Sequence, residues 1–137
     1  MCAIIKNTSV YDSIKGDVFL DAQEIARTVV ELVEDKKAIN IVLLNLVSEA
    51  AVNLADYFVI CTGTSDRQLN ALVDHLRVEM KEKYELLPLS VQGTADSGWV
   101  LVDYGYVIIH MFLEEKRQYY DLEGLWRQES QVLLSIQ

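Results

Sequence analysis

Two short stretches of the sequence contain residue types that could carry out chemistry. Gly63-Thr64-Ser65 follows an apolar run and precedes a helical pattern, where free backbone amides can hold a phosphate. His110 lies in an apolar run and could form a nucleophilic triad with Ser65 and an aspartate. The nucleophile elbow, Walker and dinucleotide patterns are all missing. The plainer interpretations are therefore favoured, namely a capped turn and a hydrogen-bonded structural histidine.

Carboxylates and metal-ligating residues give equally little support for an enzyme. Nucleotidyl transfer needs clustered carboxylates to hold metal ions, yet no Asp-x-Asp or Asp-x-Glu falls on an expected strand. Asp56 and Asp103 flank strand ends, where capping or turn bonding explains them as well. Two histidines and two separated cysteines do not form a convincing zinc site. We expect no catalytic residue, metal or cofactor, and a nucleotidyl- or phosphoryl-transfer enzyme remains the alternative.

The length and composition of the chain indicate that a single domain positions these residues. The 137 residues are 51% hydrophobic with one proline, which is typical of one compact domain. The net charge of −9 provides no large basic patch, which disfavours extensive binding to nucleic acid or anionic membranes. The chain has no long apolar run, signal-peptide core or disulfide framework, so we expect a cytoplasmic protein.

The periodicity of apolar residues predicts the order of elements. Residues 1–20 lack sustained periodicity and are interpreted as a loosely ordered N-terminal extension. Asp21 and Ser65 are expected to cap two helices, and Pro88 permits only an edge strand. Strands are expected at 41–46, 57–62, 99–103 and 106–113, and short helices after 114 and 121. This order predicts an α/β domain over 21–126, a mixed β-sheet with helices packed on it, followed by a C-terminal extension over 127–137.

The last two strands should form a hairpin with two different faces. A two-residue turn at Tyr104-Gly105 pairs Trp99 with His110 and Asp103 with Tyr106. These residues then share an aromatic and partly polar face with Leu101 and Ile108. The opposite face is entirely apolar and is expected in the core: Val100, Val102, Val107, Ile109 and Met111. The aromatic face is therefore the candidate binding surface, since tryptophan and tyrosine are enriched in interface hot spots.

Four separate blocks of this sequence resemble the ribosomal silencing factor family, also called the Iojap-like family. The resemblance runs from about Asp21 to Trp126 in the same order and spacing. Serine is more common where Asn53 and Asp66 stand, and aspartate is usual where Tyr106 stands. The blocks are Asn53–Ile60, Cys61–Ser65 with Arg67-Gln68, Trp99–Gly105 with Val107–His110, and Tyr119–Glu123 with Leu125-Trp126.

The resemblance implies a nucleotidyltransferase-like α/β fold without catalytic carboxylates. It further implies binding to the large ribosomal subunit through ribosomal protein L-fourteen, which blocks joining with the small subunit and represses translation without a cofactor. By motif match the contact includes Trp99 and Tyr104. The hairpin face and the aromatic cluster add His110, Met111 and Tyr120. The chain's acidity then favours a basic ribosomal protein over RNA as the partner, and a homodimer is a further possibility.

Overall fold

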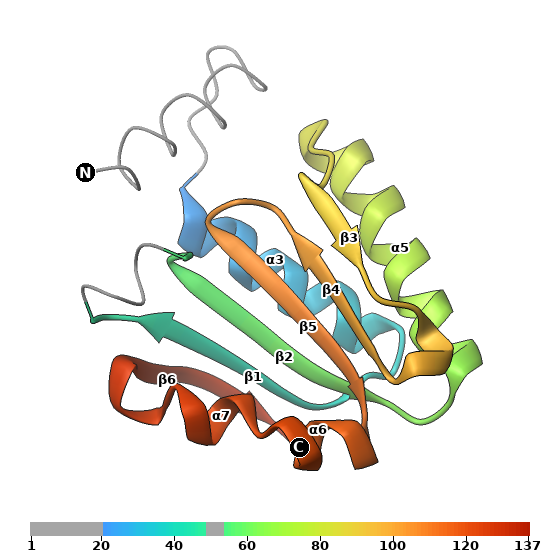
Figure 1. Cartoon of the computed structure of the whole chain (residues 1–137). Coiled ribbons are helices and arrows are strands. Elements are labelled where there is room, and N and C mark those ends of the chain that lie inside the picture. Colours follow the sequence, from blue (N-terminus) through green and yellow to red (C-terminus); the bar gives the residue numbers. More distant parts are fainter. Residues whose placement is uncertain (1–20, 49–53) are drawn as a thin grey trace.

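The computed structural model describes residues 21–48 and 54–137, which form one mixed six-stranded sheet with helices on both faces (Figure 1). The strand order is β3-β4-β5-β2-β1-β6. The expected N-terminal extension, 1–20, lies outside the described residues. The strands are β1 (Ile39–Leu46), β2 (Tyr57–Gly63), β3 (Ser90–Gln92), β4 (Trp99–Asp103), β5 (Val107–Leu113) and β6 (Ser130–Ile136). The α-helices are α3 (Ala22–Asp35), α5 (Asp66–Tyr84), α6 (Glu114–Tyr120) and α7 (Leu122–Leu125).

The two strands at the centre of the sheet, β2 and β5, run parallel, while the other neighbouring pairs are antiparallel. A parallel pair needs a long crossover connection, and here that connection contains α5. The expected α/β class and mixed sheet are confirmed. Pro88 precedes β3, a three-residue strand at the edge of the sheet. This agrees with the prediction, because a proline cannot donate a ladder hydrogen bond.

Both long helices begin at the predicted caps. The Asp21 carboxylate accepts a hydrogen bond from the Glu24 amide at 2.8 Å, and the Ser65 hydroxyl accepts one from the Gln68 amide at 3.1 Å. Gln68 departs from the usual capping box. Its Oε1 accepts from the Thr64 amide and hydroxyl, and its Nε2 donates to two carbonyls at the end of α3. The start of α5 is therefore tied to the end of α3.

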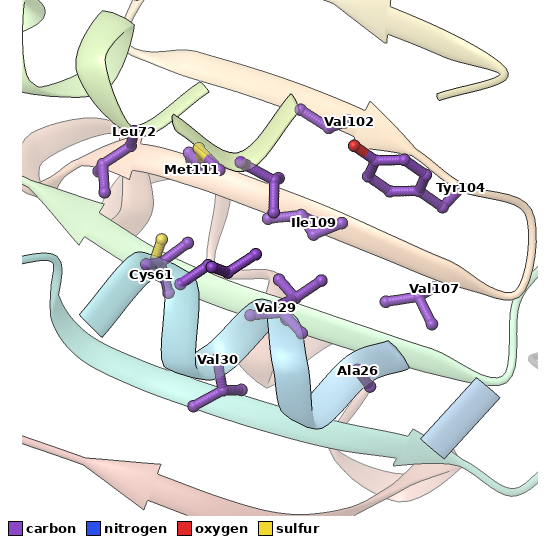
Figure 2. Packing of buried hydrophobic residues seen from close by; sticks show 14 of the residues in the cluster. Ala26, Val29, Val30, Cys61, Leu72, Val102, Tyr104, Val107, Ile109 and Met111 are labelled. Carbon is purple, nitrogen blue, oxygen red and sulfur yellow. The ribbon is translucent and has the colours of Figure 1, made fainter. Parts of the chain in front are cut away.

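The main hydrophobic core lies between the sheet and helices α3 and α5, as Figure 2 shows. Residues Val29 and Leu72 on the helices pack with Cys61, Ile109 and Met111 on the central strands, all fully buried. Burial raises the pKa of the Cys61 thiol to about 12, so this cysteine is an inert core residue at neutral pH. Among the helices of the described residues, none is long and apolar enough to cross a membrane.

The second face of the sheet carries α6, α7 and a smaller core. Residues 127–137, interpreted above as a C-terminal extension, contribute β6, which pairs with β1 from Ser130 to Ile136. The sheet therefore continues beyond the expected boundary at Trp126. The four apolar residues of β6 give too weak a local pattern to predict a strand, and the hydrogen bonds to β1 supply the missing order.

The register of the final hairpin differs from the prediction by two residues. Trp99 lies opposite Phe112, and Leu101 lies opposite His110, because the turn lies one residue further along the chain than expected. The Tyr104 amide donates to the Val107 carbonyl at 2.9 Å, which leaves Gly105-Tyr106 rather than Tyr104-Gly105 at the tip. The Asp103 carboxylate accepts a hydrogen bond from the Gly105 amide at 2.7 Å, which accounts for this carboxylate through turn bonding. A shift of two keeps each strand residue on its expected face. Tyr106, expected on the open face, instead belongs to the turn and is buried in the main core.

Candidate partner-binding surface

The structure separates the five predicted site residues into two groups. Tyr104 and Met111 are buried in the main core, on the side of the sheet that α3 and α5 cover (Figure 2). They do not line a surface, so their expected direct contact with a partner is corrected to a role in the fold. The other three, Trp99, His110 and Tyr120, meet on the opposite face.

Four rings form what we call the aromatic cluster: Trp99, His110, Phe112 and Tyr120. The Trp99 ring lies 5.0 Å from Phe112, in a stacked arrangement, and 4.5 Å from Tyr120. Phe112 was missed in the sequence, although it follows His110 by two residues and therefore shares its face. Since Tyr120 is 43% exposed and Trp99 is half-buried, part of this cluster is available to a partner.

A shallow pocket adjoins the aromatic cluster. Its volume is about 280 Å³, and the side chains of Trp99, Leu101 and Tyr120 form its apolar part. Gln92, Gly93 and Ser97 form its polar part. An aromatic surface with an adjoining mixed pocket is the kind of place where an interface hot spot forms, because an inserted side chain loses water on several sides.

His110 has a structural role within this cluster. Its Nδ1 accepts a hydrogen bond from Trp99 Nε1 at 3.3 Å, so the proton of the neutral ring resides on Nε2. Burial lowers the pKa of His110 from 6.5 to about 4, and the ring is neutral at pH 7. Ser65 instead caps α5, and no hydrogen bond joins it to His110 in the described residues. The triad considered for Ser65 and His110 is therefore not assembled.

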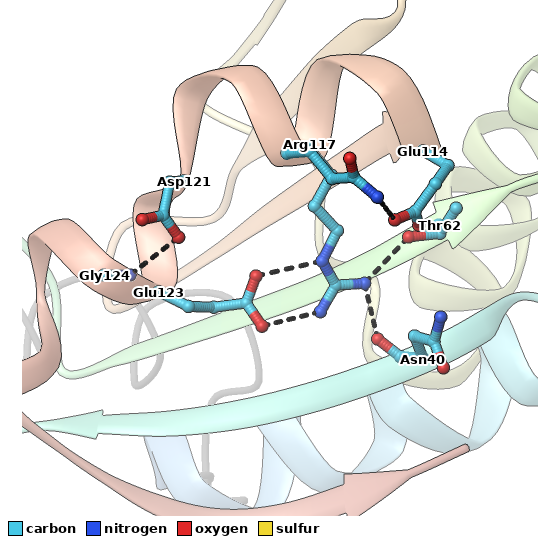
Figure 3. A network of polar contacts seen from close by, with 8 residues as sticks. Asn40, Thr62, Glu114, Arg117, Asp121, Glu123 and Gly124 are labelled. Atoms are coloured by element: carbon cyan, nitrogen blue, oxygen red, sulfur yellow. Dashed lines mark hydrogen bonds and ion pairs between the residues drawn. The ribbon is translucent and has the colours of Figure 1, made fainter.

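Arg117 fixes α6, whose last residue is Tyr120, and the following helix α7 to the sheet (Figure 3). Its guanidinium donates to both carboxylate oxygens of Glu123, at 3.0 and 2.9 Å. It also donates to Thr62 Oγ1 on β2 at 2.8 Å and to the Asn40 carbonyl on β1 at 2.6 Å. One buried side chain thus joins α6, α7, β1 and β2. The sequence gives no local sign of this, because its partners lie up to 77 positions away.

The metal-binding and phosphate-binding sites considered from the sequence are not assembled in the described residues. Among residues 21–48 and 54–137, no group of three or more His, Cys, Asp or Glu side chains is placed to hold a metal ion. At Gly63-Thr64-Ser65, the Thr64 amide already donates to Gln68 and the Ser65 hydroxyl caps the helix. This stretch is accounted for as a capped turn. The expectation that the chain is not an enzyme stays a prediction.

Comparison with known proteins decides the family. The sequence pattern described as "Ribosomal silencing factor during starvation" matches residues 20–137. The chain belongs to the ribosomal silencing factor family. It is 38% identical over 105 residues to ribosomal silencing factor RsfS of Halalkalibacterium halodurans, covering 76% of this chain and 86% of that protein. The resemblance identified from the sequence blocks is thereby confirmed, and the match extends through β6.

The similarity extends to a solved structure and to a more distant relative. A crystal structure of a Chromobacterium violaceum protein has a TM-score of 0.72 and 34% identity, covering 79% of this chain and 88% of that one. The mouse protein named mitochondrial assembly of ribosomal large subunit protein 1 is 35% identical over 100 residues, covering 71% of this chain and 42% of that protein. The silencing factor fold is thus shared, while its likeness to nucleotidyltransferases stays a prediction.

Proposed function

We propose that this silencing factor binds the large ribosomal subunit through ribosomal protein L-fourteen and sterically blocks joining with the small subunit. It would thereby repress translation in the cytoplasm without any covalent step. The observation that carries the proposal is the exposure of Trp99 and Tyr120 in the aromatic cluster, beside the mixed pocket of about 280 Å³. Membership of the silencing factor family supplies the ribosome as the partner. The name of the mouse relative, which refers to the large subunit, supports the choice of subunit.

The charge of the chain supports a protein rather than RNA as the direct partner. With a net charge of −9, the protein is repelled by phosphates and attracted to the basic proteins of a ribosome. Complementary charge accelerates association, while buried aromatic anchors supply most of the affinity. We therefore expect Trp99 and Tyr120 to be the anchors. The buried His110 would fix the orientation of the Trp99 ring by accepting its hydrogen bond.

Steric blocking requires no catalytic residue, but it requires a rigid folded body. A folded domain of this length has a radius of gyration of about 14 Å. Docked on the joining face of the large subunit, such a body would keep the facing surfaces of the two subunits apart. The Arg117 contacts and the aromatic stacking serve this mechanism, because they hold the docking surface rigidly on the sheet.

The test is co-sedimentation of the purified chain with isolated large subunits, followed by the same measurement with small subunits added. We expect Trp99→Ala to weaken binding at least 30-fold, equivalent to about 2 kcal/mol at a hot spot. Val132→Ala is the matched control, because Val132 is exposed on the far strand β6. Unchanged binding by the Trp99 variant would contradict the aromatic anchor. Binding that leaves subunit joining intact would contradict steric blocking.

A further inference from the structure

The outer surface of α5 carries a second hollow, far from the aromatic cluster. We call it the α5 groove, and it has a volume of about 480 Å³. Its lining residues belong to the middle and the end of α5 and to the segment that leads into β3. Figure 1 shows α5 beside this segment, on the side of the sheet that α3 and α5 cover. The lining residues are Asp74, Arg77, Val78, Lys81, Leu87 and Pro88. The aromatic cluster occupies the opposite side of the sheet, so the two surfaces are separate.

Aliphatic side chains project into solvent around this groove. Val78, Leu87 and Leu89 are 53%, 60% and 58% exposed. The chain direction explains why two leucines are left outside. α5 ends at Tyr84, its C-cap Glu85 adopts the left-handed conformation, and Leu86 then turns inward and is fully buried. Pro88 keeps the following segment extended, so its neighbours on either side face outward. A group of exposed aliphatic residues beside a hollow is typical of an interaction surface.

The charge at the groove is opposite to that of the chain as a whole. Arg77 and Lys81 lie one helical turn apart and repel each other, while Asp74 is the one carboxylate in the lining. Neither Arg77 nor Lys81 makes an ion pair with a residue in the described part of the chain. Two cations without ion-pair partners therefore flank exposed aliphatic groups, in a protein with 21 acidic and 12 basic residues.

We propose that the α5 groove binds an acidic, apolar segment of a protein other than the one held by the aromatic cluster. Carboxylates of that segment would pair with Arg77 and Lys81, and an aliphatic side chain would lie between Val78 and Leu87. An acidic segment relieves the repulsion between the two cations, and its apolar side chains remove the exposed aliphatics from water. RNA fits less well, because phosphates offer nothing to Val78, Leu87 and Leu89. Both faces of the sheet could be occupied at once.

The proposal is tested by selecting random 16-residue peptides that bind the full chain. Each enriched peptide is then measured against Trp99→Ala and against the double variant Arg77→Glu/Lys81→Glu. We expect a class of peptides with more Asp and Glu than Lys and Arg. This class should bind Trp99→Ala normally and lose at least 10-fold in affinity with the double variant. Leu87→Ser should weaken the same peptides, and both variants should retain the wild-type circular dichroism spectrum and binding to large subunits.

Three outcomes would overturn the proposal. The first is that no enriched peptide distinguishes the double variant from the wild-type chain. The second is that the peptides which do so lack an excess of acidic residues. The third is that a 16-nucleotide random RNA binds more tightly than those peptides, with an affinity that depends on Arg77 and Lys81 and falls steeply with salt. Because large-subunit binding is measured separately, failure of this site and failure of the proposed function can be told apart.

Discussion

The two faces of the sheet differ in how many aromatic rings their strands supply. On the side covered by α3 and α5, the buried side chains are largely aliphatic, and the strands supply Val59, Val102, Ile109 and Met111. On the other side the strands supply four rings beside aliphatic residues such as Leu44 and Ile60, under the two short helices α6 and α7. The rings are Phe58, Trp99, His110 and Phe112. One face is closed by two long helices, and the other is closed only in part.

This difference teaches how one sheet serves stability and recognition together. Aliphatic residues gain free energy in proportion to the apolar area that they bury, so the face that stabilises the fold is covered by long helices. Tryptophan and tyrosine can be half-buried because their polar atom still finds a partner or water. The Trp99–His110 hydrogen bond is such a case. A sheet face made in this way can remain partly open, ready for another protein.

The largest effect should come from the aliphatic face. Leu72→Ala removes a fully buried side chain from α5 and should lower the free energy of unfolding by about 2–5 kcal/mol. Urea denaturation measures this loss. Leu125→Ala is the control on the other side, because Leu125 is exposed, and we expect a change within about 0.5 kcal/mol. Similar losses in the two variants would break the distinction between the faces.

The next effect concerns how α6 and α7 are attached to the aromatic face. Arg117→Met removes four hydrogen bonds and leaves Thr62 Oγ1 and the Asn40 carbonyl without this donor. We expect unfolding to become easier by about 2 kcal/mol and Tyr120 to lose its fixed position beside Trp99. The second effect is measured as weaker binding to large subunits under conditions where the variant remains folded.

Gln118→Ala is the matched control for Arg117→Met. Its side chain makes one exposed hydrogen bond, to Glu114 in the same helix, and should leave both stability and binding nearly unchanged. If Arg117→Met bound large subunits as tightly as the wild-type chain, the short helices would not be needed to position the surface.

A comparable but pH-dependent effect belongs to His110. Its pKa is about 4 in the folded protein and 6.5 without burial, so the unfolded state takes up the proton first as the pH falls. Stability present above about pH 6.5 should be lost progressively down to about pH 4. Between pH 7 and pH 5 this amounts to about 2 kcal/mol. Denaturant midpoints measured across this range should fall more for the wild-type chain than for His110→Phe.

Trp99→Phe sharpens this measurement. It removes the Nε1 donor but keeps the imidazole buried, so the pH dependence caused by His110 should persist. Equal slopes for His110→Phe and the wild-type chain would show that burial of this histidine does not set the acid limit of stability.

Much of the fold could be predicted from the sequence because the signals involved are local. The caps at Asp21 and Ser65 act within three residues, and their hydrogen bonds form as expected. The alternation along 99–103 and 107–113 separated the aliphatic face from the aromatic one even though the hairpin register was wrong by two. A register shift of two residues leaves every side chain on the same face of the sheet. Trp99 and His110 were therefore placed on one face correctly.

The candidate site was predicted only in part, because its remaining features depend on distant contacts. The displaced turn places Tyr104 and Tyr106 in the main core, which no pattern within the hairpin predicts. Tyr120 reaches Trp99 because Arg117 binds residues on β1 and β2. The strand at 130–136 exists because β1 offers it an edge to pair with.

The sequence by itself determined the helices, the apolar and aromatic faces of the hairpin, the acidic charge and, through its four blocks, the silencing factor family. Only the tertiary structure decided which aromatic residues are exposed, that the sheet includes the last strand, and that the α5 groove places two cations beside exposed aliphatic residues. The physical reason is the range of the forces. Capping and periodicity act over a few residues, whereas exposure results from packing between elements far apart in the chain.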